Sequence, residues 1–181
     1  KEKTSKKLNQ YFEKENWKGA KKLLVSELNT APNDHFLLTQ LGEVYYEMRQ
    51  YPKALEYTQK AVEILATCPL ALNNYAVVLY MHEKYAEAIE IWLKLLNTTL
   101  SEIAYGTCNE GMRFAKSLQN DIRFRLADAY LALGNKKIAL EYYQSHYKNR
   151  KRGLFSNFSK KESETEIRNL NISTSQHDPK L

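Results

Sequence analysis

An aromatic residue, an alanine and a tyrosine or leucine return every 34 residues along the first half of the chain. The three sets at this spacing are Trp17, Tyr51 and Tyr85; Ala20, Ala54 and Ala88; and Tyr11, Tyr45 and Leu79. A fourth copy, LADAYLALGNKKIALEYY, follows the third after 51 residues, which is one period plus 17. Self-similarity at a fixed period of this size predicts a repeat architecture, and no other feature restricts the fold as strongly.

Each copy contains two helical patterns. In the second copy Leu38, Leu41, Gly42 and Tyr45 fall at the i, i+3, i+4 and i+7 positions of one helical face. A second face begins at Tyr51, directly after the pair Arg49-Gln50. Small residues recur on the facing surfaces, where they let two backbones approach closely: Gly42, Ala76 and Ala127 in the first helices, and Ala20, Ala54, Ala88 and Ala139 in the second. One helix pair cannot bury its apolar face alone, so the chain is predicted to be all-α, with stacked pairs sharing a core.

This pattern resembles the tetratricopeptide repeat, whose signature is W-x2-L-G-x2-Y followed by A, F, A and P. The segment LGEVYYEMRQYPKALEYTQKA carries the signature best, and the first copy carries it least well, with Lys7 and Leu8 in place of Leu-Gly. The resemblance covers roughly residues 1–147. It implies a right-handed superhelical solenoid of four antiparallel helix pairs, with a polar first repeat as an end cap.

The resemblance also divides the chain into parts. The predicted repeats are about 1–34, 35–68, 69–102 and 120–147, with an insertion at 103–119. Ser159 and Glu162 match a capping box, so residues 148–170 are predicted to hold a basic segment and a short capping helix over about 160–170. Leu154 and Phe155 are expected to cover the end of the last repeat. Residues 171–181 are expected to be disordered.

The family uses the concave face of its first helices to hold a peptide or a partner helix. Carrying those positions over to this sequence implies a groove lined by Asn9, Phe12, Phe36, Glu43, Tyr46, Glu47, Asn73, Tyr80, Met81, Phe124 and Asp128. Aromatic residues on an open surface act as anchors in protein interfaces. Together with the acidic residues, they favour a partner that offers an apolar or basic segment. An alternative for any one of these aromatics is packing against a neighbouring helix.

One known use of the family is the capture of an acidic chaperone C-terminal tail, which requires Lys, Asn, Asn, Lys and Arg at five positions. In this chain the positions hold Ser5, Asn9, Gln40, Leu70 and Asn74. Only Asn9 matches, and the cations that would hold carboxylates are missing. Chaperone tails are therefore disfavoured as partners.

The net charge of +6 is concentrated near the two ends. Residues 1–22 hold eight lysines against three acids, and residues 148–161 hold six cations and no acid, whereas residues 23–147 hold eleven bases against fourteen acids. In the second basic stretch, Arg150, Lys151 and Arg152 are candidates for contact with an anion. The alternative function is therefore an RNA- or anion-associated helical-repeat protein. Cations in the last turn of a helix also suit its dipole, which explains the stretch without a ligand.

The sequence offers little to catalysis. The segment MHEKY has His82-Glu83 but no second histidine four residues on, so the zinc-protease helix is absent. His146 replaces a small alanine of the family pattern and is expected to pack against the next element. We expect no enzyme activity, no cofactor and no metal. Two cysteines, expected to be reduced, and the lack of a signal peptide or membrane span favour a cytoplasmic location. The chain begins at Lys1 rather than at methionine, which is compatible with loss of an upstream segment.

The stretch GTCNEGMRFAKSLQN (106–120) interrupts the repeats. From Met112 to Leu133 it contains neither glycine nor proline and keeps helical spacing. We predict that GTCNEG forms a loop and N-cap, and that MRFAKSLQN lengthens the first helix of the fourth repeat. A break at Asn120-Asp121 is the alternative. In the longer helix, Arg113 and Lys116 would project and form a local binding feature. The functional prediction is a non-catalytic protein–protein interaction scaffold: an adaptor, an assembly factor or a partner-specific chaperone.

Overall fold

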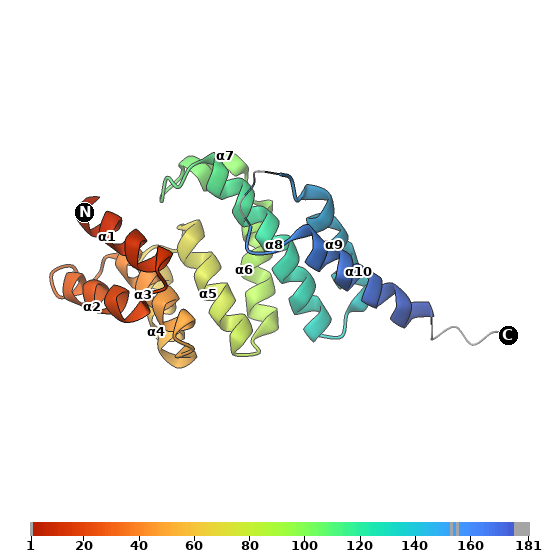
Figure 1. The fold of residues 1–181 in the computed structure, drawn as a ribbon, viewed down its shortest axis with the longest axis horizontal. Helices are drawn as coiled ribbons and strands as arrows, with labels where there is room; N and C mark the ends of the chain where they lie inside the picture. The colour runs from red at the N-terminus through yellow and green to blue at the C-terminus, as the bar shows by residue number, and fades with distance from the viewer. Residues whose placement is uncertain (1, 153, 155, 176–181) are drawn as a thin grey trace. The chain divides into compact units, whose positions relative to one another are not determined.

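The computed structural model describes residues 2–152, 154 and 156–175, and all regular structure in that part of the chain is helical (Figure 1). It contains ten helices, which fall into two compact units, Lys1–Lys84 and Tyr85–Leu181. No helix among the described residues is long and apolar enough to cross a membrane. The all-α prediction is confirmed.

The first unit holds five helices. They are α1 (Glu2–Glu13), α2 (Trp17–Leu28), α3 (His35–Glu47), α4 (Tyr51–Ile64) and α5 (Pro69–Met81). All five helices contribute to its core, which includes Leu8, Leu24, Leu41, Ala54 and Val78. Asp34 caps α3 by accepting hydrogen bonds from the backbone N–H groups of Phe36 and Leu37 at 3.0 and 3.2 Å.

The turn inside each predicted pair has the same geometry, which confirms the repeat at the level of single hydrogen bonds. The turn residues Glu15, Arg49, Glu83 and Gly134 are all left-handed, with φ of 51°, 57°, 60° and 78°. The N–H of the following residue bonds back five positions in every case: Asn16 to Tyr11, Gln50 to Tyr45, Lys84 to Leu79 and Asn135 to Tyr130, all at 2.8–3.0 Å. This is the closing bond of a Schellman motif, and it ends the first helix of each pair.

The small residues of the repeat lie where helices approach one another, as predicted. The alanines at 20, 54, 76, 88, 127 and 139 are all completely buried. At Gly42, a Cβ atom would lie 2.5 Å from Cγ2 of Thr58 on α4, a distance that real Cβ atoms do not reach. The close contact of α3 with α4 therefore requires glycine at this position.

The second unit also holds five helices. They are α6 (Tyr85–Asn97), α7 (Leu100–Tyr105), α8 (Met112–Ala132), α9 (Lys136–Asn149) and α10 (Lys160–Ser175). The 21-residue helix α8 runs without interruption, so the predicted extension is confirmed and a break at Asn120-Asp121 is excluded. The helix begins at Met112, after Gly111 with φ of 86°. The short helix α7 was not predicted, and it starts at a capping box made by Thr99 and Glu102.

Helix α10 packs against α9, and the expected capping box starts it. The N–H of Ser159 donates to Oε2 of Glu162 at 2.6 Å, and the N–H of Glu162 donates to Oγ of Ser159 at 3.2 Å. His146 on α9 is fully buried and pairs through Nδ1 with Oγ of Ser163, so its expected packing against the next element is confirmed. The helix continues to Ser175, past the expected end near residue 170, so the expected disorder is wrong for residues 171–175. Residues 176–181 lie outside the described part.

Candidate partner-binding surfaces

On the first unit, Glu43 is the centre of a polar contact between α3 and α5. Its Oε2 accepts hydrogen bonds from Nδ2 of Asn74 at 3.3 Å and from Nε2 of Gln40 at 3.5 Å. Burial raises the pKa of Glu43 to about 7; the bond from Asn74 opposes this shift and the nearby charge of Glu47 adds to it. Gln40 and Asn74 lie at two of the five positions that correspond to the chaperone-tail site of the family. In this chain both side chains donate to the carboxylate of Glu43.

Two of the predicted aromatic anchors pack against the turn that follows them. Phe12 meets Trp17 edge-on with ring centroids 5.2 Å apart, and Tyr46 meets Tyr51 at 5.8 Å. These pairs occupy equivalent places in the first and second repeats. Phe12 and Tyr46 nevertheless remain half-exposed, so each has one side on the core and another on the surface.

Phe36 lines a cavity of about 780 Å³ at the start of α3. Leu8, Ala31 and Leu37 supply further apolar walls, and Glu27 also lines the cavity. The lining also includes polar residues such as Thr4, Asn33 and Asp34. A volume of this size is within the range of sites that take a side chain or a small molecule. It lies within the first unit, among α1, α2 and α3.

The other predicted groove residues of the first unit differ in exposure. Asn9, Glu47 and Met81 are exposed, and Met81 is 37% accessible, whereas Asn73 and Tyr80 are half-buried. Burial raises the pKa of the Glu47 carboxyl, and the charge of Glu15 raises it further. The first helices of this unit therefore present both apolar and acidic groups to the surface.

In the second unit the expectation that Phe124 lies on an open surface is wrong. Phe124 is only 6% exposed, because the ring of Phe158 stacks on it with centroids 4.0 Å apart and planes 9° apart. Asp121 is also buried, and accepts hydrogen bonds from Oγ of Ser156 and from N and Nδ2 of Asn157. The segment 156–158 thus covers this face of α8. Of the residues expected to do so, Leu154 is half-buried and Phe155 lies outside the described part.

Asp128, the last predicted groove residue, is bound by Tyr143 on α9, whose hydroxyl donates to Oδ1. Burial raises the pKa of Asp128 to about 6, opposed by the Tyr143 bond and by the Arg125 charge. Its carboxyl is therefore committed to contacts inside the second unit.

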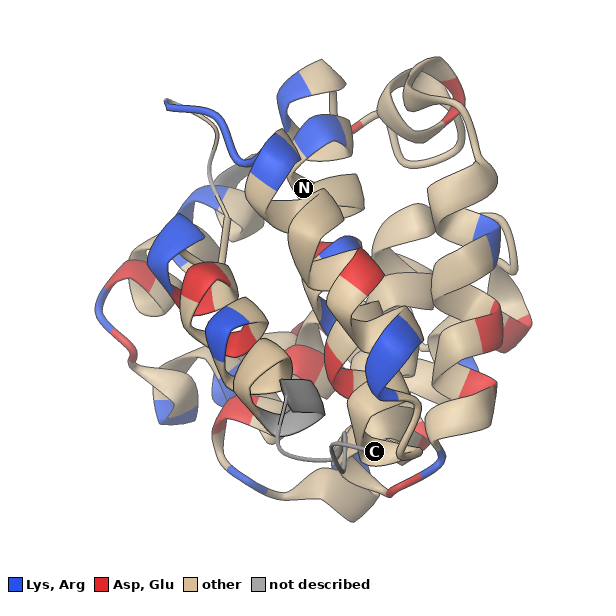
Figure 2. Ribbon diagram, turned by 90° about the vertical axis from the view of Figure 1, so that its right-hand side faces the viewer, with Lys and Arg blue, Asp and Glu red and all other residues tan. Residues whose placement is uncertain are grey.

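The three predicted anion contacts divide into two groups. The guanidinium of Arg150 donates to the carbonyl oxygens of Lys151, Leu154 and Phe158 at 2.6–3.1 Å, so its main partners are backbone groups of its own segment. Lys151 and Arg152 are exposed and line a second cavity, of about 420 Å³, with Lys116 and Arg123 of α8. Figure 2 marks the positions of lysine and arginine in blue and those of the acids in red.

Asn120 and Arg123 are among the residues of this second cavity that the sequence analysis did not predict. They follow Lys116 on α8 at i+4 and i+7, so helical periodicity alone places the three on one side of the helix. The helical spacing of these residues could therefore have been used to predict one wall of the cavity. It could not predict the other wall, because that wall contains Lys151 and Arg152, about 30 positions later in the sequence.

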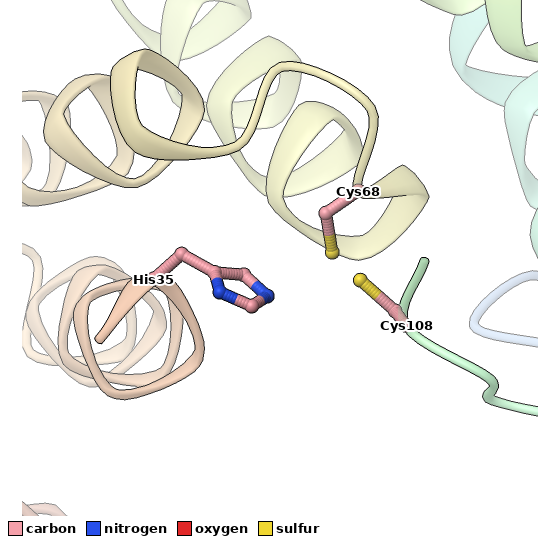
Figure 3. Close-up of side chains that lie close together, drawn as sticks. All are labelled: His35, Cys68 and Cys108. Carbon is pink, nitrogen blue, oxygen red and sulfur yellow. The ribbon is translucent and has the colours of Figure 1, made fainter. Parts of the chain in front are cut away.

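Figure 3 draws the side chains of one histidine and of the two cysteines, His35, Cys68 and Cys108. His35 is the first residue of α3 and Cys68 precedes α5 in the first unit, and Cys108 lies in the loop between α7 and α8 of the second. Within the first unit, the candidate ligand atoms of His35 and Cys68 lie within 4.8 Å of each other. Neither cysteine is a free thiol, so the expected reduced state is wrong and no longer supports a cytoplasmic location.

Comparison with known proteins gives one consistent result. Two family models described as tetratricopeptide repeat match residues 35–67 and 121–145. The Protein STIP1 homolog of Dictyostelium discoideum is 30% identical over 95 residues, which make up 52% of this chain and 14% of that protein. The chain thus corresponds to only a small part of that relative.

Solved structures agree with this chain over most of its length. The MamA RS-1 ArsTM double mutant has a TM-score of 0.68 at 14% identity, over 97% of this chain and 85% of that one. BtubC (BKLC) from P. vanneervenii has a TM-score of 0.66 at 14% identity, over 99% of this chain and 83% of that one. The N-terminal domain of stress-induced protein-1 from C. elegans has a TM-score of 0.54 at 18% identity, over 76% of this chain and 94% of that one. At these identities the likeness concerns the fold.

Proposed function

Because this chain is a tetratricopeptide-repeat protein, we propose that it is a non-catalytic scaffold for protein–protein interaction, acting as an adaptor, an assembly factor or a partner-specific chaperone. The segment that it holds lies along the first helices of the first unit, α1, α3 and α5. Partner specificity comes from the side chains on these helices, since the repeat itself only supplies their spacing.

The observation that supports this proposal most directly is the mixed surface of those three helices. Half-exposed aromatics at Phe12, Phe36, Tyr46 and Tyr80 accompany the exposed Met81. Large apolar side chains that already rest on a core lose little conformational freedom when a partner covers them, so they make efficient anchors.

The charges of the same surface favour an apolar or basic segment over an acidic one. Glu43 and Glu47 both lie on α3, one turn apart, and the charge of Glu47 helps to raise the pKa of Glu43. An acidic chaperone tail would meet these carboxylates without a lysine or arginine at the family's clamp positions. Such tails are therefore disfavoured.

A peptide-display experiment with a random library tests the proposal for any partner sequence. Random peptides are selected on the full chain, and the affinities of the selected sequences are measured for the parent and for the double variant Tyr46→Ala, Tyr80→Ala. We expect selected peptides rich in apolar and basic residues, and at least a tenfold loss of affinity in the variant, because truncation of central anchors costs more than about 1 kcal/mol each.

The matched control is Val25→Ala, Ile64→Ala, which removes two exposed apolar side chains from the second helices α2 and α4 of the same unit. The control should bind like the parent, and circular dichroism should show equal helix content in all three proteins. Peptides that bind the Tyr46, Tyr80 variant as well as the parent would refute the proposed surface.

A further inference from the structure

The cavity of about 420 Å³ in the second unit brings together four cations from two separate segments. Lys116 and Arg123 come from α8, and Lys151 and Arg152 come from the segment that follows α9. Among the described residues that line the cavity there is no Asp or Glu. None of the four cations forms an ion pair with a described carboxylate. Like charges gathered in this way repel one another unless an anion lies between them.

One wall of the cavity contains a buried amide that lacks hydrogen-bond partners. Asn120 is 1% exposed, and neither its Oδ1 nor its Nδ2 has a partner among the described residues. A buried polar group left unsatisfied costs on the order of 1–3 kcal/mol. By contrast, Nε2 of its neighbour Gln119 donates to the carbonyl oxygens of Leu96 and Thr98 at 3.3 and 2.7 Å. Asn120 is thus the polar group of this wall that a ligand would satisfy.

Arg123 is positioned to meet such a ligand. Its Nη1 donates to the carbonyl oxygen of Gln119 at 2.9 Å, which fixes one edge of the guanidinium. Burial lowers the pKa of Arg123, the direction expected of a cation taken out of water without an anionic partner. A planar guanidinium held along one edge can offer its other donors to an oxyanion.

We propose that this cavity binds a phosphate monoester, with Arg123, Lys116, Lys151 and Arg152 holding the phosphate oxygens and Asn120 pairing with a group next to the ester. A phosphate monoester carries between about −1.5 and −2 charges near neutral pH, which suits several cations better than a single carboxylate does. Because Asn120 has an unmet acceptor as well as an unmet donor, the ligand also offers an N–H or O–H close to the phosphate. This site lies in the second unit and takes a different ligand from the peptide surface proposed on the first unit. The two proposals can therefore be tested independently.

Two sources of the same chemistry fit. One is a phosphorylated side chain, whose backbone N–H lies near the phosphate, and the other is a small sugar phosphate, whose hydroxyls do. The volume lies within the range of small-ligand sites, roughly 300–1,000 Å³, and accommodates one such group. It does not follow a polymer backbone, so RNA is the disfavoured source of phosphate here.

Calorimetric titration of the full chain tests the site. The probes are capped phosphoserine, capped serine, glucose 6-phosphate, inorganic phosphate and a ten-nucleotide single-stranded RNA. We expect saturable binding of at least one ester, at least tenfold tighter than inorganic phosphate, and no binding of capped serine. A preference for phosphoserine identifies a phosphorylated protein as the source, and a preference for the sugar phosphate identifies a metabolite.

Variants separate a built site from general positive charge. Arg123→Gln and the pair Lys151→Gln, Arg152→Gln should each weaken the ester at least tenfold. The control pair Lys136→Gln, Lys137→Gln removes two exposed lysines of α9 outside the cavity and should change affinity less than twofold. Asn120→Leu should abolish the preference for the ester over inorganic phosphate while leaving the unliganded protein as stable as the parent or more so, because Leu removes an unsatisfied amide of similar volume.

The proposal is overturned if no ester binds saturably, if the Lys136, Lys137 pair matters as much as Lys151 and Arg152, or if the RNA displaces the ester at equal phosphate concentration. It is also overturned if Asn120→Leu keeps the full preference for the ester. The Asn120 result does not depend on net charge, so it remains informative even where the charge variants lose stability.

Discussion

At the scale of single residues, three of the four turns inside the repeats place a side chain in a left-handed backbone. Glu15, Arg49 and Glu83 adopt this conformation, and only the fourth turn uses glycine, at Gly134. A left-handed residue with a Cβ costs roughly 1–2 kcal/mol, whereas glycine adopts the conformation freely. The fourth turn shows that the same motif forms with glycine.

Arg49→Gly should therefore stabilise the protein by about 0.5–1 kcal/mol. This figure is the free energy gained by relieving the backbone strain, minus the cost of the greater conformational entropy that glycine gives the unfolded chain. Urea unfolding followed by circular dichroism measures the change, which should appear as a higher midpoint at unchanged slope. Gly134→Ala is the mirror-image control and should destabilise. A lower midpoint for Arg49→Gly would mean that the exposed arginine makes contacts worth more than the strain.

The Glu43 carboxyl makes the first unit sensitive to pH. Because its pKa in the folded chain is raised to about 7, its contribution to stability is fully present below the unfolded value of 4.5 and is lost as pH rises through 7. Glu43→Gln stays neutral, so it should lose less stability than the parent between pH 5 and pH 8. The difference should be about 1–2 kcal/mol after allowance for the partial exposure of the side chain.

Urea unfolding of the two proteins at pH 5 and pH 8 measures this difference. Replacing the exposed Glu56 by Gln provides a control, since that carboxylate forms only a surface ion pair with Lys60. If the free energy of unfolding changes equally between pH 5 and pH 8 in the parent and in the Glu43 variant, Glu43 titrates in the folded chain as it does in the unfolded one.

At the scale of elements, the segment 156–158 joins α8 to α10. The ring of Phe158 contacts both the ring of Phe124 and the guanidinium of Arg125. His146 and Ser163 connect α9 to α10 directly. Phe158→Ala should destabilise the second unit by about 3 kcal/mol, as expected for loss of a large aromatic group from a packed site.

Hydrogen exchange read out by mass spectrometry shows where that loss occurs. Exchange should become faster over residues 160–172 and over the face of α8 around Phe124. The control Ile172→Ala, which removes an exposed apolar side chain of α10, should leave exchange unchanged. Unchanged exchange over 160–172 in the Phe158 variant would show that α10 is held by other contacts.

Local patterns in the sequence were enough to predict most elements. The 34-residue period identified the helix pairs, the absence of glycine and proline identified the continuity of α8, and Ser159 with Glu162 identified the start of α10. Helix α7 was missed although Thr99 and Glu102 form a capping box, because six residues are too few to show periodicity. Phe124 was misplaced because the group that covers it, Phe158, lies 34 residues away in a segment without any repeat.

At the scale of the whole molecule, the uneven charge separates the two proposed kinds of binding. A peptide held by the aromatic side chains of the first unit should change its dissociation constant less than threefold between ~50 and ~200 mM salt, because burial of apolar groups responds little to screening. A ligand held by the four cations of the second unit should weaken several-fold over the same range. Fluorescence anisotropy at both salt concentrations makes the comparison. A tenfold loss for the peptide would show that charge, rather than the aromatic groups, holds it.

The extra residues before the fourth repeat lengthen α8 at its N-terminal end and leave the turn to α9 unchanged. Gly134 and Asn135 close that turn with the same hydrogen bonds as the turns of the other three pairs. The chain can therefore gain or lose residues between α7 and α8 without altering the phase of the repeats on either side. In evolutionary terms this is the place where length is free to vary: insertions and deletions among relatives should accumulate near residues 106–111, while the turns at 15, 49, 83 and 134 keep a constant length.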